Sequence, residues 1–193
     1  TYIDNRVNLL VISGGTGYDN EFSGSVLKRI ANYNITYRTA KSPGEFYEGP
    51  IDQRSFAELS AVFLLNFPAS QSASNTVQDL ANNIRMFKTP VVFFAGKNTD
   101  YQKLNSFDEL IPFTVGNPSS GESLFSLQLV SSEDNPFLKL PQLGNIGQIF
   151  RNVSGILPKP GAVTLATDRS TGEPVVMTRT SGDFKSTAFL GYG

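Results

Sequence analysis

The sequence predicts an α/β fold: a doubly wound, mostly parallel sheet with an antiparallel hairpin extension in the C-terminal half. Two observations lead to this prediction. In the first half of the chain, short apolar runs alternate with patterns of helical spacing, which is the order of β-α-β units. In the second half, strand-like runs follow one another with turn residues and little helix between them. A length of 193 residues fits one well-buried core, so residues 1–193 are expected to form a single domain.

Apolar spacing locates the elements of the first half. The expected strands are residues 7–12, 35–39, 61–67 and 91–95. The expected helices are residues 20–32, a helix that Ser72 or Ser74 caps and that ends before Pro90, and a short helix within residues 101–110. Continuous apolar strands are typical of parallel sheets that helices cover on both faces.

In the second half of the chain, expected strands follow one another with little helix between them. The expected strands are residues 122–130, 162–167, 174–180 and 186–190. Residues 178–183 precede the last apolar run and predict a hairpin. Residues 135–141 are expected to form at most one helical turn.

Two absences restrict the chemistry of the chain. The sequence contains no cysteine and no histidine. Thiol–imidazole, Ser–His–Asp and zinc-hydrolase mechanisms are therefore excluded, because each needs one of these side chains. Any enzyme mechanism would have to use carboxylates, lysine, tyrosine, serine or threonine.

Charge and hydropathy point away from several partners. The formal net charge is −1, without a run of like charge, so nucleic acid is not an expected partner. No apolar stretch approaches the length of a membrane span, so direct membrane insertion by this segment is not expected. The sequence predicts no cofactor.

A family resemblance appears in the segment Lys-Thr-Pro-Val-Val-Phe-Phe-Ala-Gly, residues 88–96. It resembles the Lys-x-Pro, buried strand and tight turn of class I glutamine amidotransferases, a superfamily of flavodoxin-like α/β architecture. The resemblance extends through residues 7–17 and 61–67 and through the helix before Lys88. It also reaches residues 173–177 and 186–191, which are similar to the late hairpin of that family. It covers most of the chain at the level of order and pattern.

The resemblance implies an empty catalytic position. In the family, the turn after the strand carries a nucleophilic cysteine, and a histidine with an acidic partner follows the last strand. By position, Ala95 or Gly96 stands at the nucleophile turn, and residues 191–193 stand near the histidine. Neither place holds a residue that can do the chemistry.

The resemblance also suggests a setting. Catalytically empty domains of this kind occur in larger bacterial membrane-anchored proteins. The chain starts without methionine, and Asp4-Asn5-Arg6 is similar to the exit from a preceding domain. We therefore expect a domain of a larger bacterial envelope protein, in an extracytoplasmic location, with other domains of that polypeptide or envelope proteins as partners.

A flavodoxin-like strand order would bring the loops after the first, third and fourth strands to one crevice, where open α/β sheets bind ligands. The candidate crevice residues are Gly14, Gly15, Thr16, Gly17, Asp19, Asn66, Lys97, Asn98 and Asp100. The glycine-rich loop could face an anion at the start of the following helix, or it could be a plain tight turn. It matches neither the dinucleotide nor the P-loop fingerprint.

The carboxylates of the chain allow two further hypotheses, a metal site and an acid–base pair. Asp19, Glu21 and Asp100 could gather around Mg²⁺ or Ca²⁺, although no metal site is assigned. Asp19 with Asp100, or Glu45 with Glu48, could form an acid–base pair. We thus expect a non-catalytic binding or scaffold domain with a degenerate amidotransferase-like crevice. The alternative is a carboxylate- or metal-dependent hydrolase that uses the same crevice, and a third possibility is a spacer module.

Overall fold

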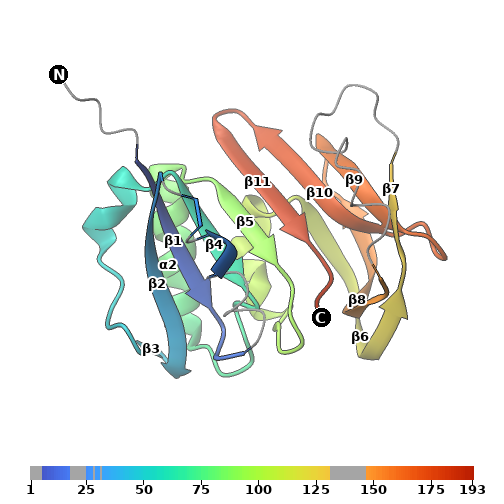
Figure 1. Cartoon of the computed structure of the whole chain (residues 1–193), viewed down its shortest axis with the longest axis horizontal. Helices are drawn as coiled ribbons and strands as arrows, with labels where there is room; N and C mark the ends of the chain where they lie inside the picture. Colours follow the sequence, from blue (N-terminus) through green and yellow to red (C-terminus); the bar gives the residue numbers. More distant parts are fainter. Residues whose placement is uncertain (1–5, 18–24, 28, 31, 131–146) are drawn as a thin grey trace.

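The computed structural model describes residues 6–17, 25–27, 29–30, 32–130 and 147–193. A nine-stranded sheet runs through the molecule in the order β3-β2-β1-β4-β5-β11-β10-β9-β7, and β6 and β8 form a separate two-stranded sheet (Figure 1). The strands of the large sheet are β1 Val7–Ser13, β2 Tyr33–Ser42, β3 Glu45–Phe46, β4 Ala61–Leu65, β5 Val91–Phe94, β7 Leu127–Leu129, β9 Ala162–Asp168, β10 Pro174–Ser181 and β11 Phe184–Phe189. The small sheet pairs β6 Phe113–Phe125 with β8 Ile149–Pro158.

The large sheet is mixed, so the expectation of a mostly parallel sheet is corrected. The pairs β2–β1, β1–β4, β4–β5 and β5–β11 are parallel. The pairs β3–β2, β11–β10, β10–β9 and β9–β7 are antiparallel. The reason is local: parallel neighbours need a long crossover, and the second half of the chain connects its strands by short turns instead. The predicted hairpin between β10 and β11 is confirmed, with Ser181 opposite Phe184.

Helix α2, Ser74–Phe87, is the longest helix among the described residues. Its buried positions Val77, Leu80, Ala81 and Ile84 form one apolar stripe against the sheet, as the spacing predicts. The N-terminal cap is not the predicted serine. Ala73 occupies that position without a side-chain hydrogen bond, and the Ser72 hydroxyl instead accepts a hydrogen bond from the Ala69 amide.

Two predicted helices differ from expectation. The short helix appears as a 3-10 helix, η2, Lys103–Leu110, and a second 3-10 helix, η1, spans Gln53–Glu58. The helix expected at residues 20–32 lies partly outside the described residues. In its described part only residues 25–27 are helical, and both Val26 and Ile30 of its expected apolar face are exposed. The segment 135–141 also lies outside the described residues.

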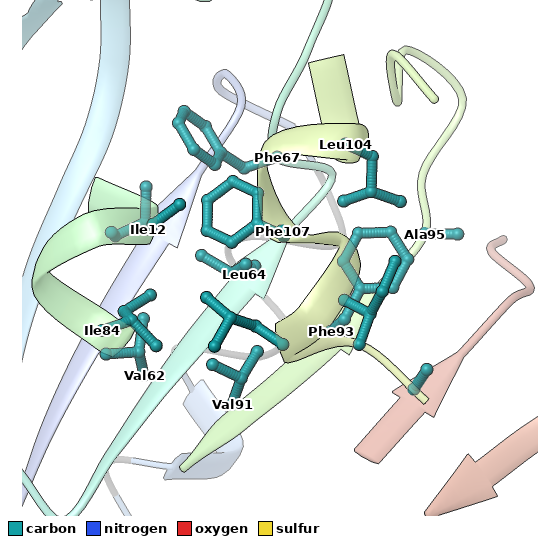
Figure 2. Packing of buried hydrophobic residues seen from close by; sticks show 14 of the residues in the cluster. Ile12, Val62, Leu64, Phe67, Ile84, Val91, Phe93, Ala95, Leu104 and Phe107 are labelled. Carbon is teal, nitrogen blue, oxygen red and sulfur yellow. The ribbon is translucent and has the colours of Figure 1, made fainter. Parts of the chain in front are cut away.

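The main core lies on one face of the large sheet, between the sheet, α2 and η2. Figure 2 shows Val62 beside Ile84 of α2, with Leu64 and Val91 of neighbouring strands close by and Phe107 of η2 next to Phe67. All of these side chains are at most 1% exposed. The cluster continues to Val153 and Ile156 of β8, so the small sheet packs onto the same core. No helix in the described part of the chain is long and apolar enough to cross a membrane.

An ion pair network links β8 to the large sheet. Arg151 of β8 is 8% exposed and contacts two carboxylates: Asp168 at the end of β9, at 3.0 Å, and Glu173 before β10, at 2.7 Å. Its guanidinium also lies 5.5 Å from the centre of the Phe125 ring. Glu173 accepts a further hydrogen bond from the Gly155 amide. The network therefore holds β8 against the β9–β10 turn.

Asp168 is the most buried member of this network, at 1% exposure. Burial alone raises the pKa of its carboxyl. Hydrogen bonds from Ser170 and Thr171 and the positive charge of Arg151 outweigh that effect, so the pKa of Asp168 lies below its usual range. The charged form of Asp168 therefore stabilises the fold.

We predict that Arg151→Met lowers the free energy of unfolding by about 3–5 kcal/mol, because it leaves a buried carboxylate without its cation. Urea unfolding followed by far-ultraviolet circular dichroism measures this change. The pH dependence has a definite sign. Asp168 contributes full stability above its unfolded pKa of about 3.9, and the contribution is lost as pH falls through the lower folded pKa. The stability difference between wild type and Asp168→Asn should therefore shrink below about pH 4, and a difference that is constant with pH would contradict this account.

Candidate functional site

The loops after β1, β4 and β5 meet at the carboxyl ends of these strands, as the sequence predicts. The Gly14 amide donates to the Leu65 carbonyl at 2.9 Å, which joins the loop after β1 to the end of β4. The Asp100 amide donates to the Pro68 carbonyl at 2.8 Å, which joins the loop after β5 to the loop after β4. Parallel strands expose their carboxyl ends at one edge, so this edge is where a ligand site is expected.

Asn66 lies at the centre of these contacts. It follows β4 with a φ of 50°, the left-handed region that asparagine tolerates better than most residues. This conformation directs its side-chain oxygen to the loop after β5, where it accepts hydrogen bonds from the Asn98 amide at 3.1 Å and the Thr99 hydroxyl at 3.2 Å. Asn66 therefore positions the neighbouring loop through its side-chain oxygen.

Asn66 lies so close to positions 14 and 96 that both must be glycine. A Cβ on Gly96 would lie 2.5 Å from the Cβ, Cγ and Oδ1 atoms of Asn66, which is too short for any real contact. A Cβ on Gly14 would overlap the carbonyl oxygen of Asn66. Only glycine fits at either place. These glycines are thus required by loop packing.

The chain after β5 forms a tight turn. The Thr99 amide donates to the Gly96 carbonyl at 3.1 Å, and the Gly96 amide donates to the Thr99 hydroxyl at 2.9 Å. Lys97 and Asn98 occupy the exposed tip of the turn. This arrangement presents the two side chains to solvent from a fixed backbone.

Asp100 fixes the turn that leads into η2. Its Oδ1 accepts hydrogen bonds from the Gln102 and Lys103 amides, both at 3.0 Å. The Lys103 ammonium lies 3.7 Å from Asp100 Oδ2 and donates to the carbonyls of Ser70 and Ser72. Asp100 therefore has a structural role at the start of η2.

Strand β8 also contributes to this site, which the sequence pattern does not indicate. Asn152 donates from Nδ2 to the Lys97 carbonyl at 2.9 Å and the Gly96 carbonyl at 3.3 Å, and its Oδ1 accepts from the Tyr101 hydroxyl at 3.1 Å. Burial raises the pKa of Tyr101, so its phenol stays protonated and donates. No strand was predicted at β8. Buried positions 149, 151 and 153 do alternate, but one of them is Arg151, and Gly155 with a φ of 67° breaks the alternation before Ile156, so the apolar pattern of the strand is weak in the sequence.

These loops surround a cavity of about 640 Å³. Its lining combines the turn after β5 and the start of η2 with residues from β6 and β8. The lining residues are Ser70, Lys97, Asn98, Thr99, Asp100, Tyr101, Gln102, Gly121, Glu122 and Asn152. Of the predicted crevice residues, Lys97, Asn98 and Asp100 line this cavity.

The remaining predicted residues lie elsewhere. Asn66 supports the cavity wall from behind the turn. Gly14, Gly15, Thr16 and Gly17 do not line the cavity. Gln71 donates to the Gly14 carbonyl at 2.6 Å, and the Ser13 hydroxyl donates to the Gly15 carbonyl at 2.7 Å. Asp19 lies outside the described residues.

The carboxylates proposed as acid–base pairs have local partners. Glu48 accepts hydrogen bonds from the amide and hydroxyl of Thr39, and Glu45 accepts from the Ser42 hydroxyl. Burial of Glu48 opposes its ionisation, but the Thr39 hydrogen bonds and the nearby Arg38 charge lower its pKa. The described residues contain no group of three acidic, histidine or cysteine side chains that could hold a metal ion.

The place that the sequence resemblance assigns to the family nucleophile is part of the packed interior. Ala95 is 5% exposed, and its amide donates to the Phe189 carbonyl at 2.8 Å. Neither Ala95 nor Gly96 has a positive φ. The left-handed residue at this edge of the sheet is Asn66, one strand away. The methyl group of Ala95 contributes to the main core.

Comparison with solved structures identifies the fold. A ThuA-like protein from Parabacteroides merdae superposes with a TM-score of 0.57 and 14% identity, over 95% of this chain and 78% of that chain. The PurLQS structure from Thermotoga maritima matches with a TM-score of 0.55 and 11% identity, over 97% of this chain and 87% of that one. The chain has a class I glutamine amidotransferase-like fold. No protein-family model matches the sequence, and no curated protein does.

We predict that Gly96→Ala destabilises the fold by about 1–3 kcal/mol, because the new methyl group must displace Asn66. Gly17→Ala is the matched control: among the residues that the structure describes, none lies within 4 Å of a Cβ at that position, so its effect should stay within about 0.5 kcal/mol. Urea unfolding measures both. Asn66→Gly combined with Gly96→Ala should cost less than the sum of the two single changes, since the clash is gone. If the double variant instead lost the sum of the two single losses in unfolding free energy, Asn66 would not be the residue that excludes a methyl group at position 96.

Proposed function

We propose that this chain is a non-catalytic recognition domain that binds a small polar ligand in the cavity beyond the carboxyl ends of β4 and β5. One observation carries the proposal. The polar groups that form the cavity wall are fixed by hydrogen bonds to one another, while Lys97 and Asn98 project from this fixed backbone. A preformed polar cavity lowers the ordering cost of binding.

The position of the cavity supports a binding role without chemistry. It lies next to the turn where class I glutamine amidotransferases carry their nucleophile, and that turn here holds Ala95 and Gly96. A core methyl group and a glycine offer no nucleophile or base. A fold of this kind can keep a pocket at the edge of its sheet after losing, or without ever having, the reacting side chains.

The rival function is a carboxylate-dependent hydrolase in the same cavity, with Asp100 and Glu122 as the available carboxylates. We favour binding because both groups are engaged. Asp100 accepts hydrogen bonds from the Gln102 and Lys103 amides. Glu122 accepts a hydrogen bond from the Tyr192 hydroxyl at 2.9 Å and lies 3.4 Å from the Lys97 ammonium. These contacts fix the position of each carboxylate, and no contact among the described residues brings the two together as an acid–base pair.

Two wider expectations belong to the same proposal. We infer a doubly wound, flavodoxin-like layout with helices on both faces of the parallel strands. The strand order β2-β1-β4-β5-β11 supports it. We also infer that the segment works beside other domains of a bacterial envelope protein, in an extracytoplasmic location. The sequence of the full reading frame tests this inference, because the inference requires envelope domains on at least one side of the segment.

A cavity-blocking variant tests the binding role. Gly121 lines the cavity, and no described residue lies within 4 Å of a Cβ built on it, so Gly121→Phe should fill the space without disturbing the fold. Gly147→Phe is the matched control, because the described part of the chain places nothing within 4 Å of a Cβ on Gly147, and Gly147 does not line the cavity. The readout is the thermal midpoint of each protein in a panel of uncharged, anionic, cationic and zwitterionic small molecules.

A ligand of the cavity should raise the midpoint of wild type and Gly147→Phe and leave Gly121→Phe unchanged. At 100 times its dissociation constant the stabilisation is about 2.7 kcal/mol. Mass spectrometry of the incubated ligand separates the two functions. An unchanged ligand supports recognition, whereas turnover that Gly121→Phe abolishes supports the hydrolase. A panel without any such ligand would leave only a scaffold role.

A further inference from the structure

The cavity contains an exposed pair of opposite charges at its rim. The Lys97 ammonium lies 3.4 Å from Glu122 Oε1, and the two side chains are 70% and 38% exposed. The Tyr192 hydroxyl donates to that same oxygen at 2.9 Å. The second Glu122 oxygen and further Lys97 protons have no partner among the described residues, so both groups can make new hydrogen bonds.

Two amides extend this set of available groups. The side chains of Asn98 and Gln102 line the cavity and have no hydrogen-bond partner within the described ranges. The other polar side chains of the wall are engaged, as Thr99, Asp100 and Asn152 show. The available groups are thus one cation, one carboxylate oxygen and two amides, which together donate and accept hydrogen bonds.

Charge balance limits the class of ligand. Lys97 and Glu122 pair with each other, and the remaining charged lining residue, Asp100, is paired with Lys103 just outside the lining, so the charges in and beside the cavity balance at neutral pH. An isolated anion would be repelled by Glu122, and an isolated cation by Lys97. A neutral ligand that both donates and accepts avoids both penalties.

Neighbouring hydroxyl groups satisfy this pair directly. Oxygens on adjacent carbons lie about one hydrogen-bond length apart, comparable with the separation of the Lys97 and Glu122 atoms. One hydroxyl can accept from the Lys97 ammonium while its neighbour donates to Glu122. Hydrogen bonds to charged groups are the stronger ones in proteins, which favours a diol at this place.

An aromatic surface lies beside the same carboxylate. The ring of Tyr192, whose hydroxyl contacts Glu122, stacks on Phe150 with ring centres 6.2 Å apart and planes 21° from parallel. Phe150 is 39% exposed. The apolar C–H face of a sugar ring can pack on such a surface while its hydroxyl groups reach polar partners.

We propose that the cavity binds a neutral carbohydrate whose vicinal hydroxyls span Lys97 and Glu122, next to the Phe150–Tyr192 aromatic pair. This inference rests on the proposed binding role and names its ligand class.

Saturation-transfer NMR on the intact chain tests the ligand class. The probes are the methyl glycosides of glucose, mannose and galactose, with inorganic phosphate and glycine as charged comparators. Lys97→Met and Glu122→Gln remove the two ends of the pair. Lys185→Met and Glu58→Gln are the matched controls, because both residues are exposed and lie outside the cavity.

At least one glycoside should bind, with its affinity lowered 10-fold or more by Lys97→Met and by Glu122→Gln and unchanged by both controls. Circular dichroism verifies folding, and each of the two cavity variants tests the pair independently of the other.

Phosphate or glycine binding that Lys97→Met abolishes, with no glycoside bound, would overturn the carbohydrate inference and keep the binding role. Glycoside binding that neither cavity variant weakens would overturn the assigned site. Absence of binding by every probe would also overturn the inference, while the Gly121→Phe screen decides the binding role separately.

Discussion

Three loops at the carboxyl edge of the sheet are arranged around one residue, Asn66. Its left-handed backbone places its carbonyl against Gly14 and its side chain against Gly96. Its side-chain oxygen then fixes the turn that carries Lys97 and Asn98. A larger residue at either glycine, or a different side chain at Asn66, changes where the turn lies. The shape of the candidate site therefore depends on this single close approach.

The sequence predicts the first half of the fold well because its signals are local. The apolar runs that became β1, β4 and β5 are short and bounded by turn residues, and the stripe on α2 has clear helical spacing. The cap of α2 was predicted less well. Ser72 is a good capping residue by type, but its hydroxyl is taken by the Ala69 amide in the preceding loop, a contact that spacing alone does not reveal.

The site was predicted only in part, for a physical reason. Lys97, Asn98 and Asp100 follow a predicted strand, so their position at the edge of the sheet could be inferred. Asn152 and Glu122 come from the small sheet, whose pairing joins segments far apart in sequence. The buried contact of Arg151 with Asp168 holds β8 in place, and a charged residue in a strand gives no sequence signal of such a role. Non-local pairing is the information that a single sequence lacks.

The position of β11 has a consequence for how the molecule is made. This strand follows every other described strand in the chain, yet it lies inside the large sheet, parallel to β5 on one side and antiparallel to β10 on the other. During synthesis, the strands on either side exist before the strand that joins them. Until residues 184–189 leave the ribosome, the edges of β5 and β10 that later pair with β11 have no partner strand. The β3–β5 part and the β10–β7 part of the large sheet therefore join into one sheet only when β11 is added.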